Sequence, residues 1–312
     1  MSKNIMRNHL FKLLIVICTM LSYGHASSTP AQDTHSAYLQ GDYAKVLKIS
    51  RPFADKGEQW AQYVIATCYF NGHGVVQDYA EAVKWYQLSA KQGNIDAQWN
   101  LGVIYDSGLG VAKDYKESVR WYRQAAEMGH SNAQFNLAVK YANGEGVPQD
   151  HSEAVKWYKL SAAQDNINAV YNLSVNYYIG RGVDKNIPEG YKLMRKAAEQ
   201  GNQFAQYNIG SMYLAGDFVE KDYSSAIKWF RLSSEQGYSK AQMDLGVMYA
   251  KGQGVAKDFV KAYKWLVLSA NQGNELAATN RDVLTRAFTL EQVQEGQNLA
   301  KECLAKKYKN CD

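Results

Sequence analysis

The sequence is poor in the residues that build metal centres and covalent active sites. Its 312 residues include only four cysteines and six histidines, scattered along the chain without an H-x-x-x-H pair or closely spaced cysteines. Zinc sites need three or four such ligands held together. Glycine pairs such as Gly108-Leu109-Gly110 follow an expected helix instead of a strand, so we interpret them as turns and not as phosphate-binding loops. We therefore predict no metal site, no cofactor and no catalytic residue.

The chain also lacks an apolar run long enough to span a membrane, which takes about 20 residues. Its most apolar stretch, Leu10 to Leu21, is preceded by Lys3 and Arg7, contains Lys12 near its start, and is followed by Gly24-His25-Ala26. Basic residues, a short apolar core and small residues at the end are typical of a secretory signal peptide. We predict cleavage after Ala26, with an uncleaved anchor as the alternative.

Removal of this segment changes the charge balance. The whole chain carries a formal net charge of +5, and the three basic residues of the segment leave +2 when it is removed. So small a charge gives no reason to expect nucleic-acid binding. The prediction is an exported protein, either periplasmic or secreted.

One alanine recurs every 36 residues without a slip. It stands at Ala61, Ala97, Ala133, Ala169, Ala205, Ala241 and Ala277. A fixed period of this size predicts an array of stacked structural repeats.

Each unit contains the signals of two helices. Apolar residues from Ala61 to Tyr69 recur at helical spacing, which predicts a first helix, here called helix A. Gly72 can adopt the left-handed conformation that ends it. A second helix, helix B, is predicted to start at Asp78, whose carboxylate caps the first turn, and Glu81 is expected to complete a capping box.

A single helix pair cannot bury both of its faces, so neighbouring units must stack. The predicted fold is all-α: an α-solenoid of stacked antiparallel helix pairs with a 36-residue repeat. Large residues on helix B are predicted to be core and to face small residues on helix A. The large set is Trp85, Trp121, Trp157, Leu193, Trp229 and Trp265, and the small set is Ala66, Gly102, Ala138, Ser174, Gly210 and Gly246.

Four regions follow from the pattern: a signal peptide at 1–26, a polar linker with a half repeat at 27–60, six full units at 61–276, and capping helices at 277–312. The fourth unit departs most from the pattern, with Leu193 in place of tryptophan, which predicts a local change of curvature. In the fifth unit Phe218 replaces a loop glycine, which predicts a different turn.

Cys303 and Cys311 lie close to the end of the chain. In an oxidising compartment we expect them to form a disulfide, with two free thiols as the alternative. Residues eight apart on a helix are separated by about 12 Å, whereas bridged Cα atoms are about 4.4–6.8 Å apart. The last helix is therefore predicted to end near Lys306.

The unit from Ala97 to Ala126 carries almost the whole motif A-Q-x-N-L-G-x-x-Y-x-x-G-x-G-V-x-x-D-Y-x-x-A-x-x-W-Y-x-x-A-A. This motif resembles the Sel1-like repeat (SLR) family, relatives of tetratricopeptide arrays. The resemblance implies a right-handed superhelix and a bacterial adaptor, regulator or toxin-neutralising protein that acts through protein–protein interaction.

Some cysteine-rich relatives bind or hydrolyse β-lactams, so a penicillin-binding or β-lactamase-like hydrolase is the alternative function. Ser225 and Lys228 match the S-x-x-K motif of such enzymes. The partner motifs S-D-N and K-T-G are absent, and both residues fall into ordinary repeat positions. Binding is therefore the preferred reading.

By analogy with tetratricopeptide arrays, helices A line a concave groove. Two sets of residues there are predicted to bind an extended segment of another protein: the aromatics Tyr63, Trp99, Phe135, Tyr171 and Tyr207, and the amides Asn100, Asn136, Asn172 and Asn208. Asparagine offers a donor and an acceptor, as a peptide backbone requires. Units about 10 Å apart would match three extended residues. The alternative is that the amides bond neighbouring turns and that the aromatics pack.

Basic residues on helix B form a second stripe. Its members are Lys84, Arg120, Lys156, Lys192, Lys228 and Lys264. Most have an acidic residue three positions earlier, so we interpret the stripe as a solvated face of paired charges. A docking strip for an acidic partner or an anionic membrane surface is the alternative.

Overall fold

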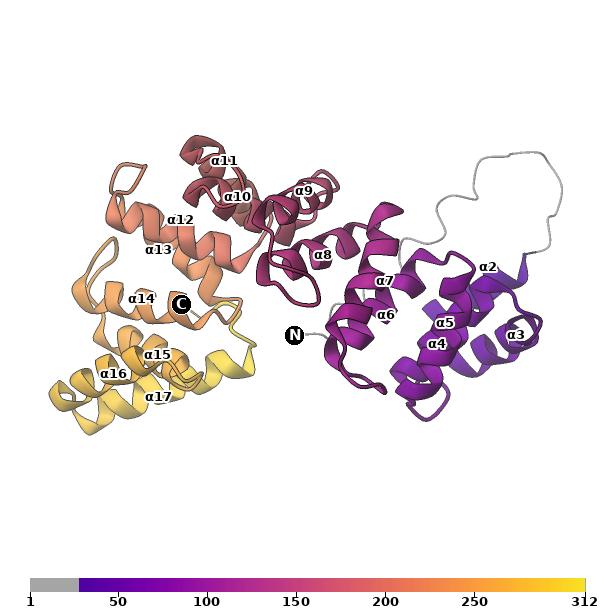
Figure 1. Cartoon of the computed structure of the whole chain (residues 1–312). Helices are drawn as coiled ribbons and strands as arrows, with labels where there is room; N and C mark the ends of the chain where they lie inside the picture. The colour runs from indigo at the N-terminus through magenta and orange to yellow at the C-terminus, as the bar shows by residue number, and fades with distance from the viewer. Residues whose placement is uncertain (1–27, 312) are drawn as a thin grey trace, which may run out of the picture.

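The computed structural model describes residues 28–311, and all regular structure in that range is α-helical (Figure 1). The helices are α2 (Pro30–Leu39), α3 (Tyr43–Asp55), α4 (Gln59–Asn71), α5 (Tyr79–Lys91), α6 (Ile95–Ser107), α7 (Tyr115–Glu127), α8 (Ser131–Asn143), α9 (His151–Ala162), α10 (Ile167–Ile179), α11 (Ile187–Glu199), α12 (Gln203–Ala215), α13 (Tyr223–Ser234), α14 (Ser239–Lys251), α15 (Phe259–Ala270), α16 (Glu275–Ala287) and α17 (Leu290–Ala305). Consecutive helices pack against each other from α2 to α16. The predicted all-α solenoid of helix pairs is confirmed, and the predicted signal peptide lies outside the described residues.

Even-numbered helices from α4 to α14 are helices A, and odd-numbered helices from α5 to α15 are helices B. Asp78 caps α5 by accepting the backbone N–H of Glu81 at 3.0 Å. The predicted capping box requires the Glu81 side chain to accept from the backbone N–H of Asp78, and the Glu81 carboxylate does not make this bond. It accepts from Lys84 at 2.8 Å and from the indole of Trp85 at 3.0 Å, so other donors occupy both of its oxygens.

Glycines end helices A. Gly72 and Gly74 have φ of 72° each, in the left-handed region that only glycine adopts without strain. Phe218 occupies the second of these two positions in the fifth unit and has φ of 63°. The predicted change of turn is therefore wrong: the turn keeps its shape, and a bulky residue accepts an unfavourable backbone conformation.

The small residues of helix A face the residue that follows the tryptophan position. A Cβ on Gly102 would lie 2.4 Å from the ring of Tyr122, and one on Gly210 would lie 2.8 Å from the ring of Phe230. Trp121 and Trp265 are buried, whereas Trp85, Trp157, Leu193 and Trp229 are half-buried. The tryptophan set is thus only partly core, and the innermost ring is one position further along helix B.

Buried glutamines join each repeat to the previous one. Gln62 donates to the carbonyl of Ala54 at 3.4 Å and accepts from Gln92 at 2.8 Å. Equivalent glutamine pairs recur in most units. Val170 stands at this position in the fourth unit, so α10 lacks the side chain that would form this clamp.

The two ends of the array differ from its interior. At the start, α2 begins at Pro30 with a complete capping box between Thr29 and Gln32. Residues 30–39 of the predicted polar linker and half repeat are therefore helical. The first repeat is thus a helix pair with a short first helix.

At the other end, α16 and α17 both pack against α15. The predicted disulfide is present, with 5.2 Å between the Cα atoms of Cys303 and Cys311. Lys307 and Tyr308 adopt the left-handed conformation and turn the chain back, as the spacing predicts. Lys264 is 1% exposed and donates to the Cys311 carbonyl. It is therefore not part of an exposed basic stripe, because α17 and the C-terminal segment cover α15.

Within the described residues, no helix has the length and apolarity needed to cross a bilayer.

Candidate functional site

Helices A and helices B face different sides of the array. In Figure 1, α8 and α10 lie on the inner side of the arch, and α9 and α11 lie on its outer side. Helices on this side also contact each other directly: α6 contacts α8, and α14 contacts α16. Half-buried residues run along the centre of this inner face: Val103, Val139, Val175, Ser211 and Val247. We call this row, with the side chains beside it, the helix A groove.

The aromatics and amides predicted to bind a partner differ in exposure. Tyr63 is 7% exposed, Trp99 3% and Asn100 4%. The remaining six are half-buried: Phe135, Asn136, Tyr171, Asn172, Tyr207 and Asn208. A partner that reaches the groove without rearranging it therefore meets the later units.

The asparagines are hydrogen-bonded to tyrosines of neighbouring helices. Asn172 donates to the Tyr158 hydroxyl at 3.1 Å, and Asn208 donates to the Tyr171 hydroxyl at 3.3 Å. Burial raises the pKa of Tyr158 to about 12, so this hydroxyl stays protonated at neutral pH. The amides thus help to hold successive repeats together, and each keeps further hydrogen-bonding capacity.

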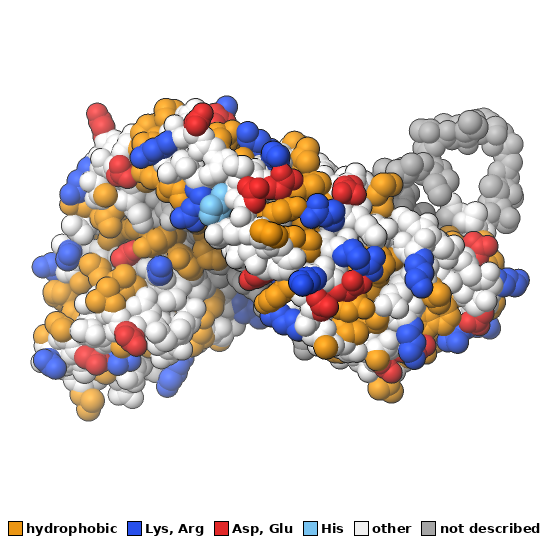
Figure 2. Space-filling model, in the orientation of Figure 1, with side chains coloured by type: hydrophobic (Ala, Val, Ile, Leu, Met, Phe, Trp, Pro, Cys, Tyr) orange, Lys and Arg blue, Asp and Glu red, His pale blue; other side chains and the backbone are white. Residues whose placement is uncertain are grey.

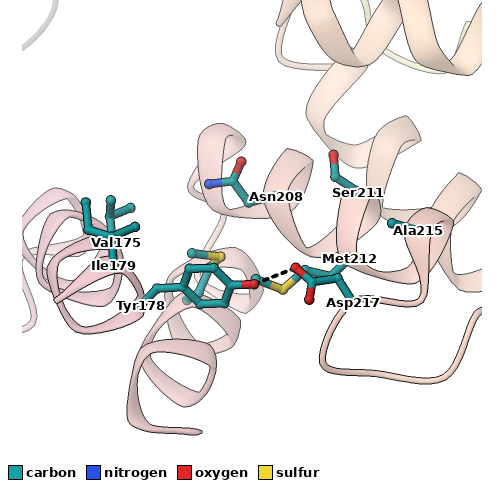
Figure 3. Close-up of a pocket in the computed structure, with 9 residues that line it drawn as sticks. Val175, Tyr178, Ile179, Asn208, Ser211, Met212, Ala215 and Asp217 are labelled. Atoms are coloured by element: carbon teal, nitrogen blue, oxygen red, sulfur yellow. Dashed lines mark hydrogen bonds between the residues drawn. The ribbon is translucent and has the colours of Figure 1, made fainter. Parts of the chain in front are cut away.

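Between α10 and α12 the groove widens into a pocket of about 390 Å³ (Figure 3). Its walls are aliphatic: Val175 and Ile179 from α10, Met194 from α11, and Met212 and Ala215 from α12. In Figure 3 the Tyr178 ring crosses the space between the two helices toward the loop after α12.

Polar groups stand around the same pocket. Asn208 and Ser211 line it from α12. The Tyr178 hydroxyl donates to Asp217 at 2.5 Å (Figure 3), and this bond raises the pKa of Tyr178 to about 12. An apolar interior with a few polar groups at its edge is the usual composition of a binding pocket.

Two departures from the repeat lie at or beside the pocket. The residue equivalent to Tyr158 is Met194, which has no ring and no hydroxyl to offer Asn208. In addition, Phe218 replaces a loop glycine next to Asp217, and its ring lies 5.1 Å from the ring of Tyr191 in α11.

The charges beside the pocket differ from those of the third unit. There, buried Lys140 pairs with Asp106 and with Glu145, the latter at 2.7 Å. Two units later the equivalents of Lys140 and Glu145 are Met212 and Asp217. The fifth unit has an apolar residue where the third has a lysine, as the other units with Cys68, Ile104 and Met248 do. Among the described residues Asp217 forms no direct ion pair.

A second carboxylate lies one unit further along the groove. Asp244 occupies the asparagine position of the sixth unit. Burial raises its pKa, while a hydrogen bond with Tyr207 lowers it. Among the described residues no lysine, arginine or histidine forms a direct ion pair with it. The groove thus carries a second carboxylate one unit beyond the pocket, and its charge is partly offset by Lys240.

The basic stripe on helix B is largely neutralised. Lys84 pairs with Glu81 at 2.8 Å and Lys156 with Glu153 at 2.7 Å, and the same pairing occurs at Arg120 and Lys192. Figure 2 shows acidic and basic side chains interspersed over the face it presents. These contacts support the interpretation of a solvated helix face.

The residues of the S-x-x-K match do not form a recognisable catalytic arrangement. Ser225 lies in the first turn of α13, where its hydroxyl is hydrogen-bonded to the capping carboxylate of Asp222 and helps to lower the pKa of that group. Lys228 is exposed on the outer face. Within residues 28–311, no three His, Cys, Asp or Glu side chains come together as a metal site would require.

Comparison with known proteins identifies the repeat. The Sel1 repeat model matches residues 61–94, 95–130, 131–166, 167–202, 203–238 and 239–274. The chain is similar to the solved Sel1 repeat protein of Oxalobacter formigenes, with 30% identity, 78% of this chain and 99% of that chain covered, and a TM-score of 0.72.

Two further solved structures match this chain with lower TM-scores. A protective antigen of uropathogenic Escherichia coli with an SLR fold is 29% identical over 91% of this chain and 78% of that chain, with a TM-score of 0.40. The immunity protein Pa5087 of Pseudomonas aeruginosa is 21% identical over 73% and 83%, with a TM-score of 0.45. A search of curated proteins gives no significant match.

Proposed function

Because this chain belongs to the Sel1 repeat family, we propose that it is an exported scaffold that binds an extended segment of another protein in the helix A groove. Sel1-repeat proteins are generally protein-interaction scaffolds. The observation that carries the proposal is the groove itself, a row of half-buried side chains that are aliphatic except for Ser211, flanked by amides and aromatics. Such a surface supplies apolar contact area together with hydrogen-bonding groups.

The six half-buried residues predicted from the sequence are proposed to contact the segment: Phe135, Asn136, Tyr171, Asn172, Tyr207 and Asn208. Tyr63, Trp99 and Asn100 are proposed to form the floor beneath it, because they are already buried. The groove suits an extended chain because units two to five each present one asparagine. A bound backbone would form hydrogen bonds with the amide atoms that the tyrosines leave unpaired.

The test uses the mature protein, residues 27–312, and an immobilised library of random 12-residue peptides. Peptides enriched on the wild-type protein are then measured in solution by fluorescence anisotropy. The groove variant Val103→Gln with Val139→Gln removes two aliphatic side chains from the centre of the groove. We expect it to weaken binding at least tenfold, because buried apolar contacts dominate such interfaces.

A matched control removes aliphatic surface from the outer face. Leu88 and Leu160 are 43% and 49% exposed on helices B, so Leu88→Gln with Leu160→Gln should change affinity less than twofold. Equal losses in both variants, or no enrichment of any peptide, would contradict the groove proposal. Melting temperatures of both variants separate lost binding from lost folding.

Export is proposed from the signal-peptide pattern of residues 1–26 and agrees with the Cys303–Cys311 disulfide, since disulfides persist in oxidising compartments. Intact mass spectrometry of protein purified from its native cells should show a chain that starts at Ser27 and contains the disulfide. A chain that starts at Met1 with free thiols would contradict export.

A further inference from the structure

We propose that the pocket between α10 and α12 anchors one apolar side chain of the bound segment, and that a Lys or Arg within about three residues of it pairs with Asp217. This proposal rests on the proposed function, because it concerns a segment that already lies in the helix A groove. It adds a partner chemistry: an extended peptide with an apolar residue and a nearby cation.

The apolar half of the motif follows from the pocket walls. Five aliphatic or thioether side chains line it, and two of them belong to methionines, Met194 and Met212. Methionine is flexible and adapts to differently shaped apolar groups. The pocket therefore favours a Leu, Ile, Met or Phe side chain without selecting strongly among them.

The cationic half of the motif follows from a comparison of the charges at equivalent positions of two units. Where the third unit holds Lys140 against Glu145, the fifth unit holds Met212 near Asp217. Lys140 is the only cation at this position of the repeat, and in the fifth unit the same position forms part of the apolar wall. A cation from outside would restore the pairing that the third unit makes internally, and Asp217 is exposed to solvent at the pocket.

Asp244 extends this preference for a cation further along the groove. It lies one unit beyond Asn208 and interacts with Tyr207, the neighbour of Asn208. Two carboxylates therefore lie near the pocket, both without a direct ion pair among the described residues. An acidic segment would be repelled from this part of the groove, whereas a segment with Lys or Arg would be attracted.

The pocket also lies where the tyrosine ring of a regular junction is absent. The equivalent space beside α9 is occupied by the buried Tyr158 ring, whose hydroxyl accepts from Asn172. Met194 in the same position leaves Asn208 lining the pocket. The substitution Met194→Tyr would therefore fill the pocket with the residue that other repeats already accommodate.

The experiment applies the random 12-residue library to the full mature chain and compares three variants. We expect wild-type selections to share an apolar residue with a Lys or Arg within three positions. A selected peptide should bind Met194→Tyr at least tenfold more weakly and Asp217→Asn at least threefold more weakly. Tyr158→Phe, the matched control at the regular junction, should change affinity less than twofold.

The result that overturns the anchor is wild-type affinity for Met194→Tyr and Asp217→Asn while the Val103→Gln, Val139→Gln variant still binds weakly. The groove function would then stand and the pocket would have no part in it. If the valine variant also binds normally, the proposed function itself fails. Asp217→Asn alters one exposed side chain, so it decides the question even if Met194→Tyr does not fold.

Discussion

The junction of α8 with α10 and the junction of α10 with α12 are built from equivalent positions of the repeat, yet one is packed and the other is open. In the first, the ring of Tyr158 is buried and its hydroxyl accepts from Asn172. In the second, Met194 replaces the tyrosine, and a pocket of about 390 Å³ remains.

The difference shows how a repeat protein can gain a recognition site without changing its fold. Each unit contacts only its neighbours, so the loss of one ring is confined to one junction. The helices on both sides keep their lengths and caps: α10 and α12 each have 13 residues and each ends at a left-handed glycine. The surface that a tyrosine ring would have covered becomes available to a partner.

The largest expected effect contrasts a regular unit with the divergent one. Trp121 is 5% exposed, and Trp121→Ala should lower the free energy of unfolding by about 3–5 kcal/mol, as deletion of a buried aromatic does. Leu193 occupies the same position in the fourth unit and is half-buried, so Leu193→Ala should lower it by about 2 kcal/mol or less. Urea titration followed by circular dichroism measures both. Equal losses would mean that the fourth unit is packed as tightly as the second.

A reciprocal exchange tests the two junctions directly. Tyr158→Met should lower the free energy of unfolding by about 1–3 kcal/mol, because the amide of Asn172 loses its buried partner. Met194→Tyr should change it by less than about 1 kcal/mol, since the ring enters space that is already empty. Should Met194→Tyr destabilise the protein as much as Tyr158→Met does, the pocket would be too small for the ring and the comparison would fail.

The smallest effect concerns Asp244, the carboxylate in the asparagine position. Burial raises the pKa of Asp244 above its unfolded value, and Lys240 only partly opposes this shift. A raised folded pKa favours folding below the unfolded pKa, and this contribution is lost as pH rises through the folded pKa.

Asp244→Asn should therefore raise the free energy of unfolding at pH 7 by about 0.5–1 kcal/mol, because no buried charge remains. It should also weaken the loss of stability as pH rises above the ordinary aspartate pKa of about 4. Thermal melts from about pH 4 upward provide the measurement. An unchanged pH profile would show that Asp244 is ionised without penalty, and Asn280, the equivalent residue of α16, offers Asn280→Ala as a control.

Much of this fold could be predicted because its signals are local and repeated. The 36-residue period, the helix-ending glycines and the Asp78-type caps each depend on a few neighbouring residues, and the helix end near Lys306 follows from the reach of a disulfide. Predictions failed where distant segments decide the environment. Lys264 falls in an exposed register, but α17 and the C-terminal segment bury it.

The candidate site was harder to predict for the same reason. The groove-facing aromatics and amides can be read from the repeat, but their burial depends on how closely successive helices A approach. The pocket is lined by Met194 and Met212, and each of these residues alone is an ordinary substitution. A partial signal was nevertheless present: Lys140 and Glu145 have Met212 and Asp217 as equivalents, so the fifth unit has a carboxylate without the cation that the third unit places beside it.

The most direct test of the anchor pocket follows methionine methyl signals by NMR while a library-selected peptide is titrated into the mature protein. The methyl groups of Met194 and Met212 should shift and reach saturation at the Kd measured by anisotropy. Met248, which is fully buried in the core between α14 and α15, should not shift. Saturation of binding with unmoved Met194 and Met212 signals would contradict the account.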